Sequence, residues 1–244
     1  MNPNLVEQTD KPHSKKEGTP RKSFGVFFVR RECWTLSLVG KLCLLAAIGI
    51  SMWIGLINLY PFLAYSNRVQ SNILVVDGWL PTYLLKQAAA EYATGHYTTV
   101  LTVQQTDPGA SIDLEQTRDN YVIEILVRHG IPRDRLIPIF YQNIMKDRTY
   151  HSALAISEWF KRNGGTPSSL NLVTVGPHAR RSRMLYLSVF EHRIPIGVIG
   201  LSDPSYDARR WWRSSEGIRE VLFEGVAYVY AKFIFLPWVK PTAD

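Results

Sequence analysis

Hydrophobic and polar residues divide the 244-residue chain into three parts of different character. The first part is polar and basic, the second is one long apolar run, and the third alternates short apolar runs with longer amphipathic stretches. This pattern predicts a disordered cytoplasmic tail over residues 1–41, a transmembrane helix over residues 42–66 and an extracytoplasmic globular domain over residues 67–244.

The apolar run contains no charged side chain between Leu42 and Asn67. As a helix it is long enough to cross a hydrocarbon core of about 30 Å. The tail through Lys41 carries eight lysines and arginines against four acids, and such an excess normally stays in the cytoplasm. We therefore expect a single-pass protein of the bacterial inner membrane with a periplasmic C-terminal domain. A cleaved signal peptide ending at residues 64–66 is the alternative, although the run is about twice as long as a usual signal core.

Small residues recur every four positions in this run, at Ala47, Ser51 and Gly55. On a helix they share one face and would allow two copies of the chain to pack closely in the phospholipid bilayer. A homodimer through these residues is therefore one prediction, and a chance spacing is the simpler explanation.

The third part has the pattern of strands that alternate with helices. Five short apolar runs are expected as buried strands, and the stretches between them as helices punctuated by glycine and proline. The expected strands are 71–78, 98–105, 135–141, 170–176 and 195–201, and the expected helices are 81–95, 113–130, 149–163 and 177–190. Strict alternation produces crossover units and a parallel sheet. The predicted fold is an α/β three-layer Rossmann-like sandwich with a mainly parallel five-stranded sheet, preceded by one transmembrane helix.

The last stretch, residues 206–239, is rich in aromatic residues. We expect a helix that packs against the sheet, and an end that lies back on the membrane is the alternative. A second membrane span is disfavoured because Glu224 and Lys232 fall inside the apolar window and Pro237 interrupts its end.

Ligands of open parallel sheets bind beyond the carboxyl ends of the strands, where the strand order reverses. The first expected strand ends in Asp77, Gly78 and Trp79, and the fourth leads into His178 and several arginines. In the usual strand order, Asp77 and His178 face one crevice. These two residues are the candidates for catalytic proton transfer, and Gly78 and Trp79 are candidates for ligand binding.

The helix that begins at Pro177 has its free N–H groups at the same crevice. Such a helix start attracts anions, and Arg180 and Arg181 add donors suited to phosphate or carboxylate. His178 and Arg181 share one helix face because they are three residues apart. The pattern predicts an anion site, although arginines paired with surface acids would give the same composition.

Several chemistries lack their signatures in this sequence. The only two cysteines, Cys33 and Cys43, precede the globular domain, which excludes a disulfide framework or a cysteine zinc site there. No dinucleotide, P-loop, nucleophile-elbow or zinc-protease motif is present. We therefore predict no metal and no cofactor, and a periplasmic domain is not expected to bind nucleic acid despite the net charge of +7.

Four motifs follow one another between residues 70 and 202. They are the strand end at residues 75–78, Glu115 ahead of a helix that ends at residues 129–132, a helix start with Thr149, and the segment 175–181. This ordered combination resembles the SanA/ElyC/YdcF-like family of envelope proteins. The resemblance implies a Rossmann-like domain whose polar crevice includes Glu115, Thr149 and the His178–Arg181 pair as ligand-binding groups.

Two places depart from the family pattern. His151 and Ser152 stand where the family has glutamate and asparagine after the threonine helix start, so the role of that asparagine does not carry over. Trp79 replaces a glycine-rich continuation of the first strand, which argues against nucleotide phosphate binding at that point.

Members of this family are linked to envelope integrity and to peptidoglycan or surface polysaccharide assembly, and one cytoplasmic member has been associated with S-adenosylmethionine. The resemblance and the anion site together predict a membrane-anchored envelope-biogenesis protein that binds an anionic precursor, phosphorylated or a lipid-linked sugar. As an enzyme it would hydrolyse or transfer at a phosphate or glycosyl bond, with Arg181 holding the anion. The alternatives are a non-catalytic accessory protein of polysaccharide assembly or export, and a nucleotide or S-adenosylmethionine binder.

Overall fold

A computed structural model describes residues 36–106, 121–142 and 146–239 of the chain. It contains one five-stranded parallel sheet in the order β3-β2-β1-β4-β5. The strands are β1 (Ile73–Asp77), β2 (Thr99–Thr106), β3 (Leu136–Gln142), β4 (Leu170–Val175) and β5 (Ile196–Leu201). The predicted α/β class with a parallel five-stranded sheet is confirmed.

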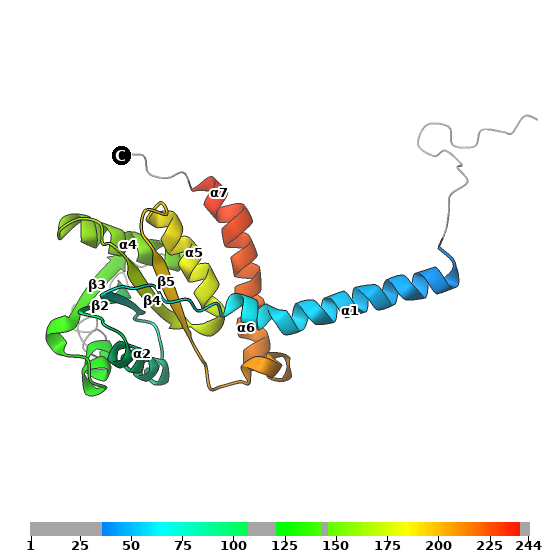
Figure 1. Cartoon of the computed structure of the whole chain (residues 1–244), viewed down its shortest axis with the longest axis horizontal. Helices are drawn as coiled ribbons and strands as arrows, with labels where there is room; N and C mark the ends of the chain where they lie inside the picture. The colour runs from blue at the N-terminus through cyan, green and yellow to red at the C-terminus, as the bar shows by residue number, and fades with distance from the viewer. Residues whose placement is uncertain (1–35, 107–120, 143–145, 240–244) are drawn as a thin grey trace, which may run out of the picture. The chain divides into compact units, whose positions relative to one another are not determined.

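Helices cover both faces of this sheet, so the domain has three layers (Figure 1). Helix α2 (Thr82–Thr94) and the helical residues 121–128 pack on one face, where Leu74 and Val76 point. Helices α4 (Arg148–Arg162) and α5 (Ala179–Val189) pack on the other face, against Val75 and its neighbours. Alternate residues of a strand point to opposite faces, so both faces of the central strand are apolar and both are buried.

The connections place the carboxyl ends of all five strands at one edge of the sheet. Strand β1 lies between β2 and β4, and this is the point where the strand order reverses. The short turn η2 (Gly176–His178) joins β4 to α5 at that edge. The first and fourth strands are therefore neighbours at the point where a crevice is expected.

Helix α1 (Leu38–Leu63) begins a few residues before the expected start of the span and ends a few residues before its expected end. Its side chains are mostly exposed, and it is long and apolar enough to cross a membrane. From Ile48 onwards, α1 forms one compact unit with the α/β domain. Ser51 and Gly55 are exposed, and the homodimer through the small-residue stripe stays a prediction.

The C-terminal stretch forms η3 (Ala208–Arg213), α6 (Ser215–Tyr230), the π-helical turn η4 (Ala231–Phe235) and α7 (Leu236–Trp238). The Ser214 hydroxyl caps α6 by accepting a hydrogen bond from the Gly217 N–H at 3.0 Å. The segment Ser215–Trp238 also has the length and composition of a membrane span.

The main contacts of α6 differ from the expected packing against the sheet. They are with η2, η3 and α5. Buried Val221 packs with Trp211 and with Leu63 at the end of α1 in a small separate core. The physical reason is that two helical layers already cover the sheet, so α6 buries its apolar residues against the edge of a layer and against the anchor. Helix α6 is therefore part of the domain.

Candidate functional site

A cavity of about 690 Å³ opens at the carboxyl ends of the strands. Its walls come from the ends of β1, β2 and β4, the first turns of α4 and α5, and one side of α6. The sequence-predicted residues that line it are Asp77, Gly78, Trp79, Thr149, His178 and Arg181. The volume is in the usual range for small-molecule sites, so the structure brings these six residues to one place that a ligand can occupy.

Asp77 lies at the inner end of the cavity, where β1 stops. Its side chain is only 3% exposed, and its Oδ2 atom has no hydrogen-bond partner among the described residues. Burial raises the pKa of this carboxyl above 3.8, while the nearby His178 and Arg181 oppose that rise. A buried acid that holds its proton longer than usual is suited to donate it.

Gly78 and Trp79 shape the cavity beside Asp77. The Gly78 N–H donates to the Val103 carbonyl at 2.9 Å, and a Cβ at Gly78 would stand 2.8 Å from that oxygen and against Gln104. Only glycine therefore fits this close approach of two strands. The Trp79 ring meets the His178 ring edge-on, with 5.5 Å between their centroids.

The buried side chain of His178 lies between the Thr149 hydroxyl and the Glu224 carboxylate. Its Nε2 atom lies 3.2 Å from Thr149 Oγ1, and its Nδ1 atom lies 2.9 Å from Glu224 Oε1. The Nδ1 atom also lies 2.9 Å from Nη2 of Arg181, which can only donate, whereas the ionised Glu224 carboxylate can only accept. Which ring nitrogen carries the proton therefore depends on which of these two contacts Nδ1 makes. When the Nδ1 proton is bonded to Glu224, the neutral ring presents an unprotonated Nε2 to the Thr149 hydroxyl.

Arg181 holds Glu224 in place from the other side. Its Nε and Nη2 atoms donate to Oε2 and Oε1 of Glu224 at 2.8 and 2.9 Å. Burial would raise the pKa of Glu224, but the charges and hydrogen bonds of His178 and Arg181 outweigh burial and lower this pKa to about 2. Glu224 is therefore ionised at every physiological pH and balances the positive charge of Arg181.

Arg180 is the exception among the predicted ligand-binding groups, because it does not line the cavity. Its guanidinium lies over the Phe62 ring at 4.1 Å and the Tyr65 ring at 4.8 Å, and it donates to the Phe62 carbonyl. Adjacent residues of a helix point about 100° apart. Only Arg181 can then share the face of His178, and Arg180 holds the chain at the end of α1 instead.

Glu115 lies outside the described residues, so its expected role has no structural counterpart here. Thr149 is in the first turn of α4, as the sequence predicts, and its hydroxyl reaches the cavity. His151 lies one residue further along α4, and its ring contacts Tyr150 edge-on.

Sequence reasoning missed three charged residues of the site. Glu224 stands 46 residues after His178, and the sequence suggested only that it disfavours a second span. Arg148 and Arg219 line the cavity, and among the described residues neither makes an ion pair. A charged residue inside an apolar helix needs a partner, and this was the signal that could have identified Glu224.

The described residues contain no group of three or more histidines, cysteines or acids that could hold a metal ion. The cavity offers an imidazole, a hydroxyl 3.2 Å from it, the buried acid Asp77 and three further acids, namely Asp147, Glu220 and Glu224. The amino ends of two helices complete it, together with Arg148 and Arg219, which make no ion pair with another described residue. Such a set can bind an anion and move a proton.

Comparisons of the chain with models of protein families, with curated proteins and with solved structures found no match.

Proposed function

We propose that this protein is a membrane-anchored protein of envelope biogenesis whose cavity binds an anionic precursor and hydrolyses or transfers a phosphate or glycosyl bond. The observation that carries the proposal is the chain from Thr149 through His178 to Glu224 at the edge of the cavity. A hydroxyl, an imidazole and a carboxylate in this order are the parts of a general-base relay. The envelope assignment rests on the family resemblance and on the apolar helix α1.

In this reaction His178 takes a proton at Nε2 from the attacking hydroxyl, which belongs to a bound water or to Thr149. The oxygen then bonds to the phosphorus or anomeric carbon, and the bond to the leaving oxygen breaks. That oxygen receives a proton from His178 or from Asp77. Where Thr149 is the attacking group, a water or acceptor hydroxyl deprotonated by the same imidazole then displaces Thr149 from the phosphorus or anomeric carbon, and the Thr149 oxygen takes a proton back from the imidazole. Glu224 keeps the imidazole in the reactive tautomer.

The anion is held by Arg148, Arg219 and the amino ends of α4 and α5. This differs from the expectation that Arg181 binds the ligand directly, because the charge of Arg181 is already balanced by Glu224. Arg181 acts as a positioning residue for Glu224 and His178 in this scheme.

The membrane topology is part of the proposal. Helix α1 crosses the inner membrane once, with the basic tail in the cytoplasm, and the domain faces the periplasm beside lipid-linked precursors. A reporter that is active only outside the cytoplasm, fused after residue 244, is expected to be active.

The function is tested with the full chain in detergent micelles. The measurements are thermal stabilisation and phosphate or sugar release with a polyprenyl pyrophosphate, with a polyprenyl-phosphate-linked sugar and with inorganic phosphate alone. We expect stabilisation by the lipid-linked probes, loss of turnover in His178→Ala, and no change in the matched control His151→Ala. Stabilisation without turnover would instead support the non-catalytic accessory role. No stabilisation by any probe would refute the anion-binding cavity.

A further inference from the structure

The outer side of the C-terminal helical segment is apolar and exposed. Phe223 and Val226 are each 70% exposed, Phe233 is 64% exposed and Trp238 is 82% exposed. Further exposed apolar residues on the same segment are Ile218, Leu222, Val229, Tyr230 and Ile234. The spacing of residues 222, 226, 229 and 233 places one row of apolar side chains along a single helix face. An apolar face of this extent on a water-facing surface is unusual and indicates an interaction surface.

The opposite side of α6 is polar and belongs to the domain. Glu220 accepts a hydrogen bond from Tyr206, and Glu224 pairs with His178 and Arg181. The apolar and polar sides are therefore segregated, as in a helix that lies at a boundary between water and lipid. Helix α6 cannot leave the domain to cross a membrane without leaving buried charges unpaired.

The membrane anchor contacts this same helix. Leu59 of α1 lies 3.7 Å from where a Cβ on Gly225 would be, and the Phe62 and Tyr228 rings meet with 5.3 Å between centroids. Nearer the start of α1, the Trp53 ring meets the Trp212 ring of η3 with 5.7 Å between centroids. Trp53 lies ten residues before the end of an apolar helix that is long enough to span a bilayer. Ten residues are about 15 Å of helix, so the domain covers the last turns of α1 and the membrane-crossing part of the helix precedes Trp53. A segment packed against Trp53 then lies at the level of the bilayer surface.

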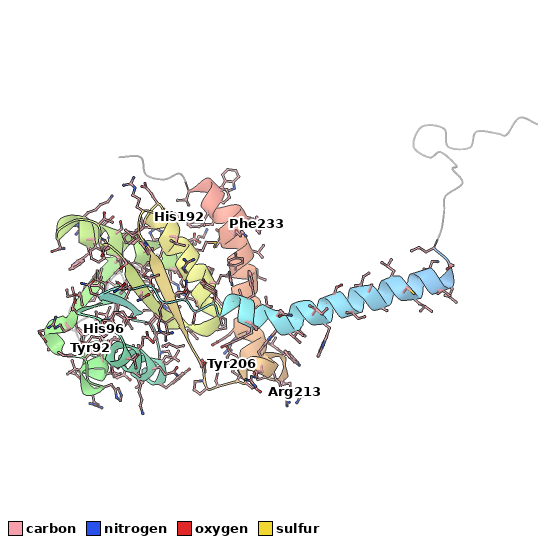
Figure 2. The ribbon with its side chains drawn as sticks, viewed as in Figure 1. Tyr92, His96, His192, Tyr206, Arg213 and Phe233 are labelled. Carbon is pink, nitrogen blue, oxygen red and sulfur yellow. The ribbon has the colours of Figure 1, made fainter. Side chains whose placement is uncertain are left out.

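Charged residues flank the apolar face in a way that suits lipid headgroups. Arg209, Arg210 and Arg213 are exposed on η3 next to Trp212, and Lys232 is exposed beside Phe233. The exposed acids nearby are Asp207 and Glu216. Figure 2 labels Arg213 at the η3 end of the segment and Phe233 near its other end. Arginine, lysine and tryptophan at the edges of an apolar face are typical of interfacial helices.

We infer that the apolar side of α6, η4 and α7 lies in the outer-leaflet interface of the bilayer that α1 crosses. The occupant of this surface is therefore phospholipid, and the segment is an interfacial helix that runs along the membrane. One further consequence rests on the proposed function. Phe223, Glu224, Ala227 and Tyr230 wall the cavity, so the cavity borders the bilayer surface and a lipid-linked substrate can reach it without crossing water.

Depth-dependent fluorescence quenching tests this placement in the full chain. Cys33 and Cys43 are replaced by serine, and an environment-sensitive dye is attached to Val226→Cys or Phe233→Cys after reconstitution in phosphatidylcholine–phosphatidylglycerol vesicles. The matched control is Glu158→Cys on the exposed side of α4. Nitroxide lipids are expected to quench both α6 sites at least about twofold and to leave the control unquenched, with the headgroup-proximal nitroxide acting more strongly than one at the chain end.

Three results would overturn the inference. Equal, weak quenching at Val226 and Glu158 would place α6 in water, and strongest quenching by the deep nitroxide would make it a membrane span. Protection of Val226 from both lipid nitroxides and aqueous iodide would show that a protein, such as a second copy, covers the face. The readout needs no substrate, so its failure is distinguishable from failure of the proposed chemistry. Thermal unfolding of each labelled variant checks that the fold is retained.

Discussion

Two arginine–glutamate pairs stand at opposite ends of the parallel sheet, and both are bidentate. At the amino ends of the strands, Arg68 donates from Nε and Nη2 to Glu91 at 2.7 and 2.6 Å. At the carboxyl ends, Arg181 makes the same two bonds to Glu224 at 2.8 and 2.9 Å. The chemistry of the pairs is identical, so their surroundings decide what each can do.

The surroundings of the first pair are saturated. Tyr97 donates to Glu91, and Asn171 bonds the backbone of Val69 through both its amide nitrogen and its oxygen. A hollow of about 730 Å³ lies beside this pair, but it is more open to solvent than the cavity at the other end. We interpret the Arg68–Glu91 pair as structural.

The second pair leaves hydrogen-bonding capacity unused. Buried polar atoms of Asp77 and Gln104 have no partner among the described residues, and both residues line the cavity of this pair. Unsatisfied buried groups are costly, and two of them line the same cavity. A buried arginine–glutamate pair alone therefore does not indicate a functional site. A pair that also holds a histidine beside unsatisfied polar groups does indicate one.

Removing the carboxylate of each pair should give the largest difference in stability between the two pairs. Glu224→Ala leaves the largely buried Arg181 without a carboxylate and is expected to lower the free energy of unfolding by about 3–5 kcal/mol. Glu91→Ala leaves Arg68, whose side chain is 58% exposed and reaches water, so a loss of about 1–2 kcal/mol is expected. Denaturant unfolding of the full chain in mild detergent measures both values. Equal losses would contradict the distinction.

Acid titration is expected to have the next largest effect. The pKa of Glu224 falls from 4.5 in the unfolded chain to about 2 in the fold, so the ionised form stabilises the native state. This stabilisation, about 3 kcal/mol, is complete above pH 4.5 and is lost as the pH falls from about 4.5 to about 2. Unfolding curves from pH 6 to pH 2 should therefore be much flatter for Glu224→Gln than for the wild type. A wild-type curve that is already flat would contradict the shift.

The ionised carboxylate of Asp77 should affect the free energy of unfolding in the opposite direction to that of Glu224. Its pKa is raised by burial, so its ionised form opposes folding at neutral pH. Asp77→Asn is expected to raise the free energy of unfolding at pH 7, and this gain should vanish as the pH falls through the raised pKa toward 3.8. Equal stability of Asp77→Asn and the wild type at pH 7 would mean that the carboxylate has a partner in solution.

The fold and one half of the site follow from the sequence for physical reasons. Short apolar runs separated by amphipathic stretches determine the parallel sheet, and the sheet determines that Asp77 and His178 meet. Glu224 could not be placed in the same way. Its helix has a polar side with Glu220 and Glu224 and an apolar side, and the usual rule turns the apolar side toward a domain, whereas here the polar side faces it. The docking of α6 depends on the anchor and on α5, and this is tertiary information.

A substitution at Thr149 tests the relay without altering the Arg181–Glu224 pair. Thr149→Val removes the hydroxyl at nearly constant volume, so it should reduce kcat about a hundredfold or more with little change in stability, and Thr149→Ser should restore most of the activity. Thr98→Val, at the amino end of the sheet, is the control and should change neither. Full activity in Thr149→Val would leave water as the only nucleophile consistent with the site.

The smallest effects distinguish two arginines that the sequence treats alike. Arg180→Ala removes contacts with the Phe62 and Tyr65 rings and should cost about 0.5–1 kcal/mol of stability without changing the affinity for inorganic phosphate or a polyprenyl pyrophosphate. Arg148→Ala removes a cavity cation that has no ion pair among the described residues, and it should weaken binding of the same probes about tenfold without a comparable loss of stability. Calorimetric titration and thermal unfolding of both variants measure the two effects. If Arg180→Ala weakened binding as much as Arg148→Ala, the anion would have to sit at the end of α1, outside the cavity that Thr149 and His178 share.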